Sequence, residues 1–397
     1  ACSACESNKY EVSNMCRGCV AHPCLLTCPK GAISMVNGKS FIDQDKCIHC
    51  GRCKAVCPYD AIAHKERPCE RACGVKAIES DEQGRASINQ DKCVSCGMCM
   101  VSCPFGAISD KSQIFQLSHA LREGTEIIAE IAPAYINQFG EDVTPGKFRS
   151  ALKQLGFSNI YEVALGADIG CISEAHHYAK EVATGHLPFL LTSCCPSWSV
   201  MAKKYFPAMI DNISQELTPM VATARIVKKE HPHAKVVFIG PCASKKLEAM
   251  RHSVRSDVDF VITFEELWGL FDAKSITPST CEELPEETQA ATAAGRGYAI
   301  AGGVAGAIEN CLKEYYPDVP VHIEHAESLA ECKKVLTLAK AGKIKNCMIE
   351  GMACPGGCIG GAGTNAGFAK TSKALKKYVD GSEPKLPSQE LENLELN

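Results

Sequence analysis

The spacing of cysteines in the first 103 residues constrains this chain more than any other feature. Of the 26 cysteines in the 397-residue chain, 16 fall in this stretch, and most neighbouring pairs have two or three residues between them. In a short secreted protein such thiols would form disulfides, but this chain is long and its first residues are polar, without an apolar signal segment. C-x-x-C groups in such a chain favour metal binding in a reducing compartment, so we expect thiolate ligands and a cytoplasmic location.

The thiols occur in repeats. Two copies read Cys-x2-Cys-x2-Cys-x3-Cys-Pro, at residues 47–58 and 93–104, and a looser copy spans residues 16–29. A fourth copy keeps only Cys69 and Cys73, and the copies are followed by the similar phrases KGAI, YDAI, VKAI and FGAI. The run resembles that of bacterial ferredoxins, where three cysteines bind one [4Fe–4S] cluster and the fourth binds the neighbouring cluster.

The repeats pair into two ferredoxin-like units and predict about four accessory [4Fe–4S] clusters. Three predicted ligand sets are Cys16, Cys19, Cys24 and Cys57; Cys28, Cys47, Cys50 and Cys53; and Cys73, Cys93, Cys96 and Cys99. Cys69 and Cys103 then lack two ligands, and we expect Cys2 and Cys5 to complete a fourth cluster with them.

Two alternatives to this assignment stay open. Cys69 and Cys103 could be idle beside a frayed N-terminus. Structural zinc also takes four thiolates, although tandem copies of this spacing are more typical of iron–sulfur clusters. A chain of clusters only transfers electrons, so this region should serve a second, catalytic part.

Beyond about residue 113 the sequence alternates apolar strands with amphipathic helices. The expected strands are residues 125–133, 187–192, 235–240 and 258–263, and the expected helices include residues 147–155 and 220–231. The pattern predicts an α/β fold with mixed sheets flanked by helices. We expect a ferredoxin-like domain at 1–112, a catalytic domain at 113–380 and a polar tail at 381–397.

Charge and hydropathy exclude two classes of partner. The net charge of −4, without a dense basic run, argues against nucleic acid. No apolar stretch approaches the length of a membrane span.

Three motifs follow strands of the second region, where sites collect in α/β proteins. They read LTSCCPSW (residues 191–198), PCASKKLE (241–248) and EGMACPGGCIGGAG (350–363). We expect them to bring four cysteines together around one more cubane cluster: Cys195, Cys242, Cys354 and Cys358. Adjacent side chains of an extended segment point to opposite faces, so Cys194 and Cys195 should have different roles.

In this order the three motifs resemble those of the [FeFe]-hydrogenases, TSCCP-x-W, PC-x-x-K-x-x-E and E-x-MAC-x-GGC. The resemblance implies a two-lobed domain that holds the H-cluster, a cubane bridged by Cys358 to a two-iron subsite with CO, cyanide and an azadithiolate. It also implies reversible cleavage of H2, with H2 and protons as substrates. Electrons would pass to a ferredoxin-type carrier, and dedicated maturases would supply the two-iron subsite.

The resemblance further implies roles for single residues. Cys194 would relay protons, which suits a thiol because its pKa of about 8.5 lies close to neutrality. The remaining roles are a proton path through Glu174, Ser214 and His177, a cyanide hydrogen bond from Lys245, and a pocket lined by Ala132, Pro133 and Met352.

The chain departs from the family pattern at four positions around the two-iron subsite. Gly240 replaces a methionine, Ala134 a serine, Met220 a glutamine and His177 a glutamate, although a histidine still titrates near neutrality. We expect an altered redox poise or directional bias.

The alternative function is a non-catalytic one, as a hydrogen sensor or an iron–sulfur assembly relative of the hydrogenases. A sensor usually carries a signalling domain, and the assembly relatives lack the relay cysteine and the full second motif. Five further cysteines should be ordinary buried thiols: Cys171, Cys281, Cys311, Cys332 and Cys347.

Overall fold

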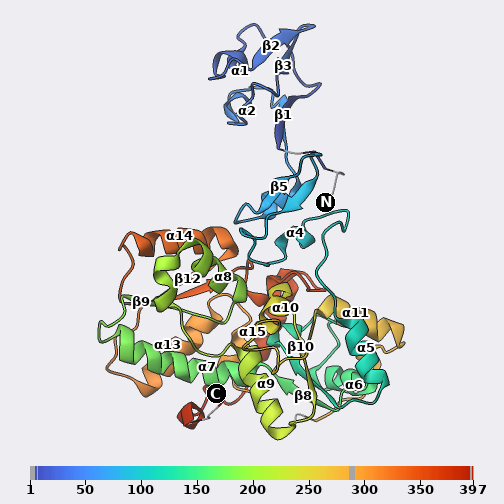
Figure 1. Cartoon of the computed structure of the whole chain (residues 1–397), viewed down its shortest axis with the longest axis vertical. Coiled ribbons are helices and arrows are strands. Elements are labelled where there is room, and N and C mark those ends of the chain that lie inside the picture. The colour runs from blue at the N-terminus through green and yellow to red at the C-terminus, as the bar shows by residue number, and fades with distance from the viewer. Residues whose placement is uncertain (1–4, 7, 286–290, 394–395, 397) are drawn as a thin grey trace. The chain divides into compact units, whose positions relative to one another are not determined.

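The computed structural model describes residues 5–6, 8–285, 291–393 and 396, and it divides the chain into two compact units (Figure 1). The first unit comprises residues 1–93 and 99–109, and the second comprises residues 94–98 and 110–397. Among the described residues, no helix is long and apolar enough to cross a membrane.

The first unit is built from short antiparallel hairpins and single-turn helices, as expected for tandem ferredoxin-like units. The strand pairs are β1 (Lys9–Val12) with β4 (Ile62–Lys65), β2 (Ile33–Val36) with β3 (Lys39–Ile42), and β5 (Ile78–Ser80) with β6 (Ala86–Ile88). The single turns are α1 (Pro23–Leu26), α2 (Arg52–Ala55) and α3 (Pro68–Ala72), with α4 (Met98–Val101) later in the chain. The isoleucines of three repeat phrases, Ile33, Ile62 and Ile78, are buried and each begins a strand.

The second unit contains two parallel sheets. One has the order β11-β10-β7-β8, with β7 (Ile127–Ile131), β8 (Asn159–Glu162), β10 (Lys235–Ile239) and β11 (Phe260–Ile262). The other has the order β12-β13-β9, with β9 (Phe189–Leu191), β12 (Ile323–Glu327) and β13 (Cys347–Met352). The expected α/β class and the four expected strands are confirmed. The sequence did not single out β8, β12 or β13, because each of these strands carries glutamate residues that interrupt the apolar pattern.

Helices flank both sheets of the second unit (Figure 1). They are α5 (Ile114–Arg122), α6 (Pro145–Leu155), α7 (Ala164–His177), α8 (Pro196–Tyr205), α9 (Pro219–Glu230), α10 (Ala243–Ala249), α11 (Phe264–Ala273), α12 (Ala293–Gly297), α13 (Gly303–Tyr315), α14 (Ser328–Lys340) and α15 (Phe368–Asp380). Local sequence sets several ends. Proline begins α6, α8 and α9, where its missing N–H costs nothing. Thr263 and Glu266 form a reciprocal capping box at the start of α11.

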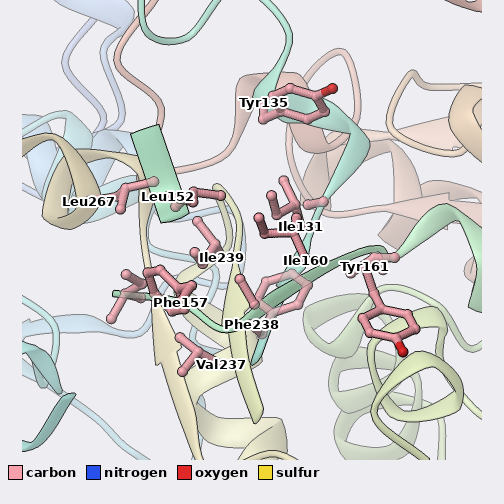
Figure 2. Close-up of a cluster of buried hydrophobic side chains, with 14 of the residues drawn as sticks. Ile131, Tyr135, Leu152, Phe157, Ile160, Tyr161, Val237, Phe238, Ile239 and Leu267 are labelled. Carbon is pink, nitrogen blue, oxygen red and sulfur yellow. The ribbon is translucent and has the colours of Figure 1, made fainter. Parts of the chain in front are cut away.

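Burial of the four-stranded sheet explains the apolar runs from which β7, β10 and β11 were predicted. Every residue of β7 is buried, as expected for a parallel sheet covered on both faces. Figure 2 shows part of this core, in which side chains of β7, β8 and β10 meet Leu152 of α6 and Leu267 of α11.

Near the C-terminus, the Tyr315 hydroxyl donates to the Pro387 carbonyl at 2.6 Å, and Arg225 Nη1 donates to the Leu396 carbonyl at 2.7 Å.

A close contact between Trp198 and Gly351 joins the first cysteine motif to the third. The Trp198 indole is fully buried on α8, and its Nε1–H donates to the Thr192 carbonyl at 3.0 Å. A Cβ at Gly351 of β13 would lie 2.1 Å from the indole ring. Only glycine lets these two segments approach so closely.

We therefore predict that Gly351→Ala lowers the free energy of unfolding by about 2–3 kcal/mol, because the added methyl overpacks the core. The matched control is Gly306→Ala in α13, where an added Cβ meets nothing within 4 Å. That substitution should leave stability unchanged or raise it by up to about 1 kcal/mol, since it removes helical backbone freedom. Thermal scans at one scan rate compare the two variants, and equal melting temperatures would contradict the close contact.

Candidate functional site

Three parallel strands of the second unit end at one cavity. Strand β9 leads through a short loop to Cys194 and Cys195 at the start of α8, and β10 leads to Cys242 at the start of α10. Strand β13 leads into the glycine loop that carries Cys354 and Cys358. The cavity has a volume of about 80 Å³.

The structure brings together the four cysteines that the sequence predicts as cubane ligands. The residues lining the cavity include Cys195, Cys242, Cys354 and Cys358. Burial raises the pKa of the Cys195 and Cys358 thiols, and the thiol of Cys242 is the first charged neighbour to raise each further. Four crowded, desolvated thiols resist ionisation unless metal cations neutralise them. This donor set therefore fits a metal cofactor.

The spacing of the thiols fits a cluster better than a single ion. Zinc needs its ligands within about 2.3 Å of one point. Within the described part of the chain, no group of three or more His, Cys, Asp or Glu side chains converges closely enough to hold one ion. A cubane has its own inorganic body, which separates the four sulfurs. Glycine is needed at position 357 (φ 86°) of the loop that carries two of these thiols, since a Cβ there would lie 2.5 Å from the Ala301 backbone nitrogen.

The adjacent thiols Cys194 and Cys195 have different neighbours, although both line the cavity. After burial, the group that most raises the pKa of Cys195 is Cys242, whereas for Cys194 it is Glu174. Burial raises the pKa of Cys194 well above its ordinary value, so this thiol keeps its proton and does not titrate close to neutrality, contrary to the expectation from the sequence. Cys195 therefore interacts most strongly with another predicted cubane ligand, whereas Cys194 interacts most strongly with an acidic side chain.

Glu174 is a buried acid on α7, with 4% of its surface exposed. Burial raises its pKa to about 8, opposed by a hydrogen bond from Ser214, while the charge of Glu216 raises it further. Its Oε2 has no hydrogen-bond partner among the described residues. A carboxyl group with a pKa near neutrality can both take up and release a proton at working pH.

The other expected proton-path residues lie close to Glu174 in the chain or in space. Ser214, 3% exposed, hydrogen-bonds Glu174. His177 is half-buried at the end of α7, one turn after Glu174. Among the described residues, the His177 side chain makes no hydrogen bond or ion pair.

Lys245 lines the cavity and is fixed by a buried ion pair. Its Nζ lies 2.6 Å from Glu248 Oε2. Burial opposes the positive charge of Lys245, but the carboxylate of Glu248 outweighs it and raises the pKa of Lys245. The ammonium group therefore stays charged and can donate its other protons into the cavity.

The remaining walls of the cavity are apolar. They include Ala132, Pro133 and Met352, as expected, together with Met220 and Phe238. The Phe238 ring accounts for one departure from the family pattern. A Cβ at Gly240 would lie 2.6 Å from this ring and 3.0 Å from the Ala132 Cβ, so there is no room for a methionine there.

Sequence reasoning missed two residues beside the cavity. Tyr298 lines it, and its buried hydroxyl has no hydrogen-bond partner among the described residues. Glu350 is 1% exposed and accepts hydrogen bonds from the Gly302 and Ala305 N–H groups, 3.1 and 2.9 Å away, at the start of α13. Its place at the head of the third motif was a signal that it holds the motif against this helix.

The first unit holds most of the thiols of the predicted accessory clusters, while Cys96 belongs to the second unit. One cavity is lined by Cys16, Cys19, Cys24 and Cys57, which are one predicted ligand set. Cys28, Cys47 and Cys53 pack in one apolar cluster that also contains Cys24 and Cys57. Burial raises the pKa of Cys53, and the charges of Cys47 and Cys50 raise it further. The second ligand set therefore stays a prediction.

The second pair of repeats is described only in part. The pKa of Cys99 is raised to about 11, chiefly by burial and next by the charges of Cys93 and Cys73. Cys103 raises the pKa of Cys69, again after burial. Cys2 lies outside the described residues, while the Cys5 carbonyl accepts a hydrogen bond from buried Arg67 at 3.2 Å. The ligands of the fourth cluster therefore stay a prediction.

The repeated Ala-Ile phrase has a structural role at each cluster. In all four repeats the backbone N–H of the alanine donates to the sulfur of the last cysteine, four residues earlier. These bonds are Ala32 to Cys28 at 3.3 Å, Ala61 to Cys57 at 3.4 Å, Ala77 to Cys73 at 3.1 Å and Ala107 to Cys103 at 3.4 Å. Hydrogen bonds to cysteine sulfur stabilise the thiolate and tune cluster potential.

Comparison with known proteins identifies the family. Residues 125–362 match the family "Iron only hydrogenase large subunit, C-terminal domain", and residues 41–63 and 86–109 match "4Fe-4S binding domain". The chain belongs to the iron-only hydrogenase family. Among curated relatives of this hydrogenase-family protein, Iron hydrogenase 1 of Clostridium pasteurianum is 29% identical over 84% of the chain and 67% of the relative. The NADP-reducing hydrogenase subunit HndD of Solidesulfovibrio fructosivorans is 30% identical over 80% of the chain and 55% of the relative.

Other relatives of this family member are not hydrogenases by name. Cytosolic iron-sulfur assembly component 3 of Bos taurus is 23% identical over 60% of the chain and 60% of the relative. Among solved structures, a variant of the [FeFe]-hydrogenase HydA1 from Chlamydomonas reinhardtii has a TM-score of 0.58 at 21% identity, over 70% of this chain and 92% of that chain. This likeness establishes a shared fold.

Glu174→Gln should flatten the pH dependence of stability between pH 4.5 and 8. In the unfolded chain the carboxyl titrates near 4.5, whereas in the folded protein it keeps its proton to about pH 8. Its contribution to stability is therefore complete below pH 4.5 and is lost as pH rises to 8. Glutamine stays neutral, so the variant should gain melting temperature relative to the parent at pH 8 but not at pH 4.5. Parallel curves for parent and variant would contradict the raised pKa.

Proposed function

We propose that this chain is a ferredoxin-linked [FeFe]-hydrogenase that catalyses reversible H2 oxidation and proton reduction. The observation that carries the proposal is the division of five thiols at one cavity. Four thiols form a set suited to a cubane, and the fifth, Cys194, faces a buried acid whose pKa of about 8 allows proton exchange near neutrality.

The walls of the cavity fit the H-cluster. Cys195, Cys242, Cys354 and Cys358 would hold its cubane, with Cys358 bridging to the two-iron subsite. When bound, the cluster supplies the iron at which H2 is split and through which the electrons leave. Lys245, held charged by Glu248, can donate a hydrogen bond to a small anionic ligand such as cyanide.

Apolar groups complete the pocket around the two-iron subsite. Ala132, Pro133 and Met352 line it without competing hydrogen bonds, and the soft thioether of Met352 tolerates an irregular neighbour. By excluding water they strengthen the interaction of Lys245 with any bound anion.

Protons would move through the chain's own acidic groups. Cys194 keeps a proton because burial disfavours its thiolate, and it can pass that proton to or from Glu174. Glu174 exchanges it with the hydroxyl of Ser214, its hydrogen-bond partner. Glu174 and Ser214 are buried, which keeps water from bypassing this part of the path, while Cys194 is half-buried and lines the cavity.

Electrons would pass through the accessory clusters of the first unit to a ferredoxin-type carrier in the cytoplasm. Two apolar side chains beside the first set of cysteines are well exposed, Val20 at 96% and Leu26 at 78%. An apolar surface close to a cluster is suited to brief contact with an electron carrier. Maturases would have to deliver the two-iron subsite.

A second candidate function is a role in iron–sulfur assembly, without turnover of H2. It is supported by the named assembly relatives, which match at identities similar to those of the hydrogenases. Such a role needs no proton path, so it leaves the pairing of Cys194 with Glu174 unexplained.

Infrared spectroscopy of the protein co-expressed with hydrogenase maturases separates the two functions. We expect stretching bands of iron-bound CO and cyanide, which no protein group produces. Cys358→Ala, which removes the bridging thiolate, should lose these bands. Their absence from the parent protein would favour the assembly function.

Cys194→Ala should keep the clusters but lose turnover. Because Cys194 is not among the four cubane ligands, iron content and cluster spectra should match the parent. H2 production should fall at least about 100-fold, within the range for loss of a proton-transfer group. Cys281→Ala, which removes a buried thiol that does not line the cavity, should retain activity. Retained turnover in Cys194→Ala would place the relay elsewhere.

A further inference from the structure

The proton path described above stops inside the protein. Glu174 and Ser214 are 4% and 3% exposed, so a proton held by either group still needs an exit to solvent. The family resemblance assigns this exit to His177, whose side chain makes no hydrogen bond or ion pair with either group among the described residues. The structure places a different acid next to Ser214.

The residue is Glu216, in the loop between Asn212 and α9. Its backbone N–H donates to Ser214 Oγ at 3.3 Å, and its carbonyl accepts a hydrogen bond from Ser193 Oγ at 3.1 Å. Ser193 also hydrogen-bonds Glu174 through its backbone. Ser193 and Ser214, which hydrogen-bond Glu174, therefore also hydrogen-bond the backbone carbonyl and the backbone N–H of Glu216.

The side chain of Glu216 is electrostatically coupled to Glu174. Among charged groups, Glu216 is the first to raise the pKa of Glu174, ahead of Glu350. The other titratable groups that interact with Glu174 are Cys194, Tyr298 and Cys171.

Those other neighbours offer no exit. Glu350, Tyr298 and Cys171 are at most 8% exposed, and Cys194 faces the cavity. Glu216 is half-exposed and so meets both the buried acid and solvent. A carboxylate at this place can accept a proton from the path and release it to water.

We propose that Glu216 is the outer proton-relay residue of this chain, between Ser214 and solvent. A proton leaving Glu174 binds the Ser214 hydroxyl oxygen, which gives up its own proton to the Glu216 carboxylate, directly or through one water. The carboxyl then releases it to solvent, and the reverse sequence brings protons in. The inference rests on the proposed function for its catalytic meaning.

The first test needs no turnover. It uses the full chain with its [4Fe–4S] clusters, before delivery of the two-iron subsite. The C=O stretch of protonated Glu174, identified by its loss in Glu174→Gln, is followed by infrared spectroscopy against pH. Glu216→Gln removes a neighbouring negative charge, so the pKa of Glu174 should fall below about 8. Asp211→Asn, which removes a charge from the same exposed segment, should leave it unchanged.

The second test uses the matured enzyme. Glu216→Gln should lower H2 production at pH 7 on the order of 10-fold and shift its alkaline decline to lower pH, with Glu216→Asp retaining more activity. An unchanged pKa of Glu174 in Glu216→Gln would overturn the inference. So would unchanged turnover in Glu216→Gln, or a larger loss of turnover in His177→Gln. If the parent shows no CO and cyanide bands, the proposed function fails, while the first test still decides whether Glu216 is coupled to Glu174.

Discussion

The convergence of four thiols at the ends of three parallel strands is the constraint on which the second unit depends. The strands β9, β10 and β13 come from two different sheets, yet their C-terminal loops meet at one cavity. Thiolates gathered around one apolar cavity repel one another, and bound metal cations would offset that repulsion. The glycine loop after β13 and the contact of Trp198 with Gly351 bring the chain segments close enough for this arrangement.

Burial acts on protons as strongly as it acts on metal ligands. The same low-polarity surroundings that keep Cys194 protonated raise the pKa of Glu174 to about 8. A carboxyl group in water would be ionised at neutral pH and could not deliver a proton there. The site thus brings the pKa of an ordinary acid into the range in which it can exchange protons near neutrality. Lys245, the ammonium group that lines the cavity, is paired with Glu248.

The first unit repeats one short phrase that both contacts a cysteine sulfur and contributes to its small apolar core. Each repeat places an alanine N–H on the sulfur of its last cysteine, and in three of the four repeats the following isoleucine is buried and begins a strand. A short phrase therefore serves both the thiolate and the small apolar core. This accounts for its recurrence where the rest of each repeat varies.

The sequence by itself determined the family of this protein and predicted its thiolate ligand sets. Cysteine spacing predicted the accessory ligand sets, and apolar runs predicted β7, β9, β10 and β11, because ligand number and strand burial leave local patterns. The three motifs predicted which four cysteines would meet. Tertiary structure decided what those patterns could not contain. The separate neighbours of Cys194 and Cys195, the raised pKa of Glu174 and the electrostatic effect of Glu216 on Glu174 depend on burial and on the distances between side chains. Those quantities arise only when segments far apart in the chain are packed together.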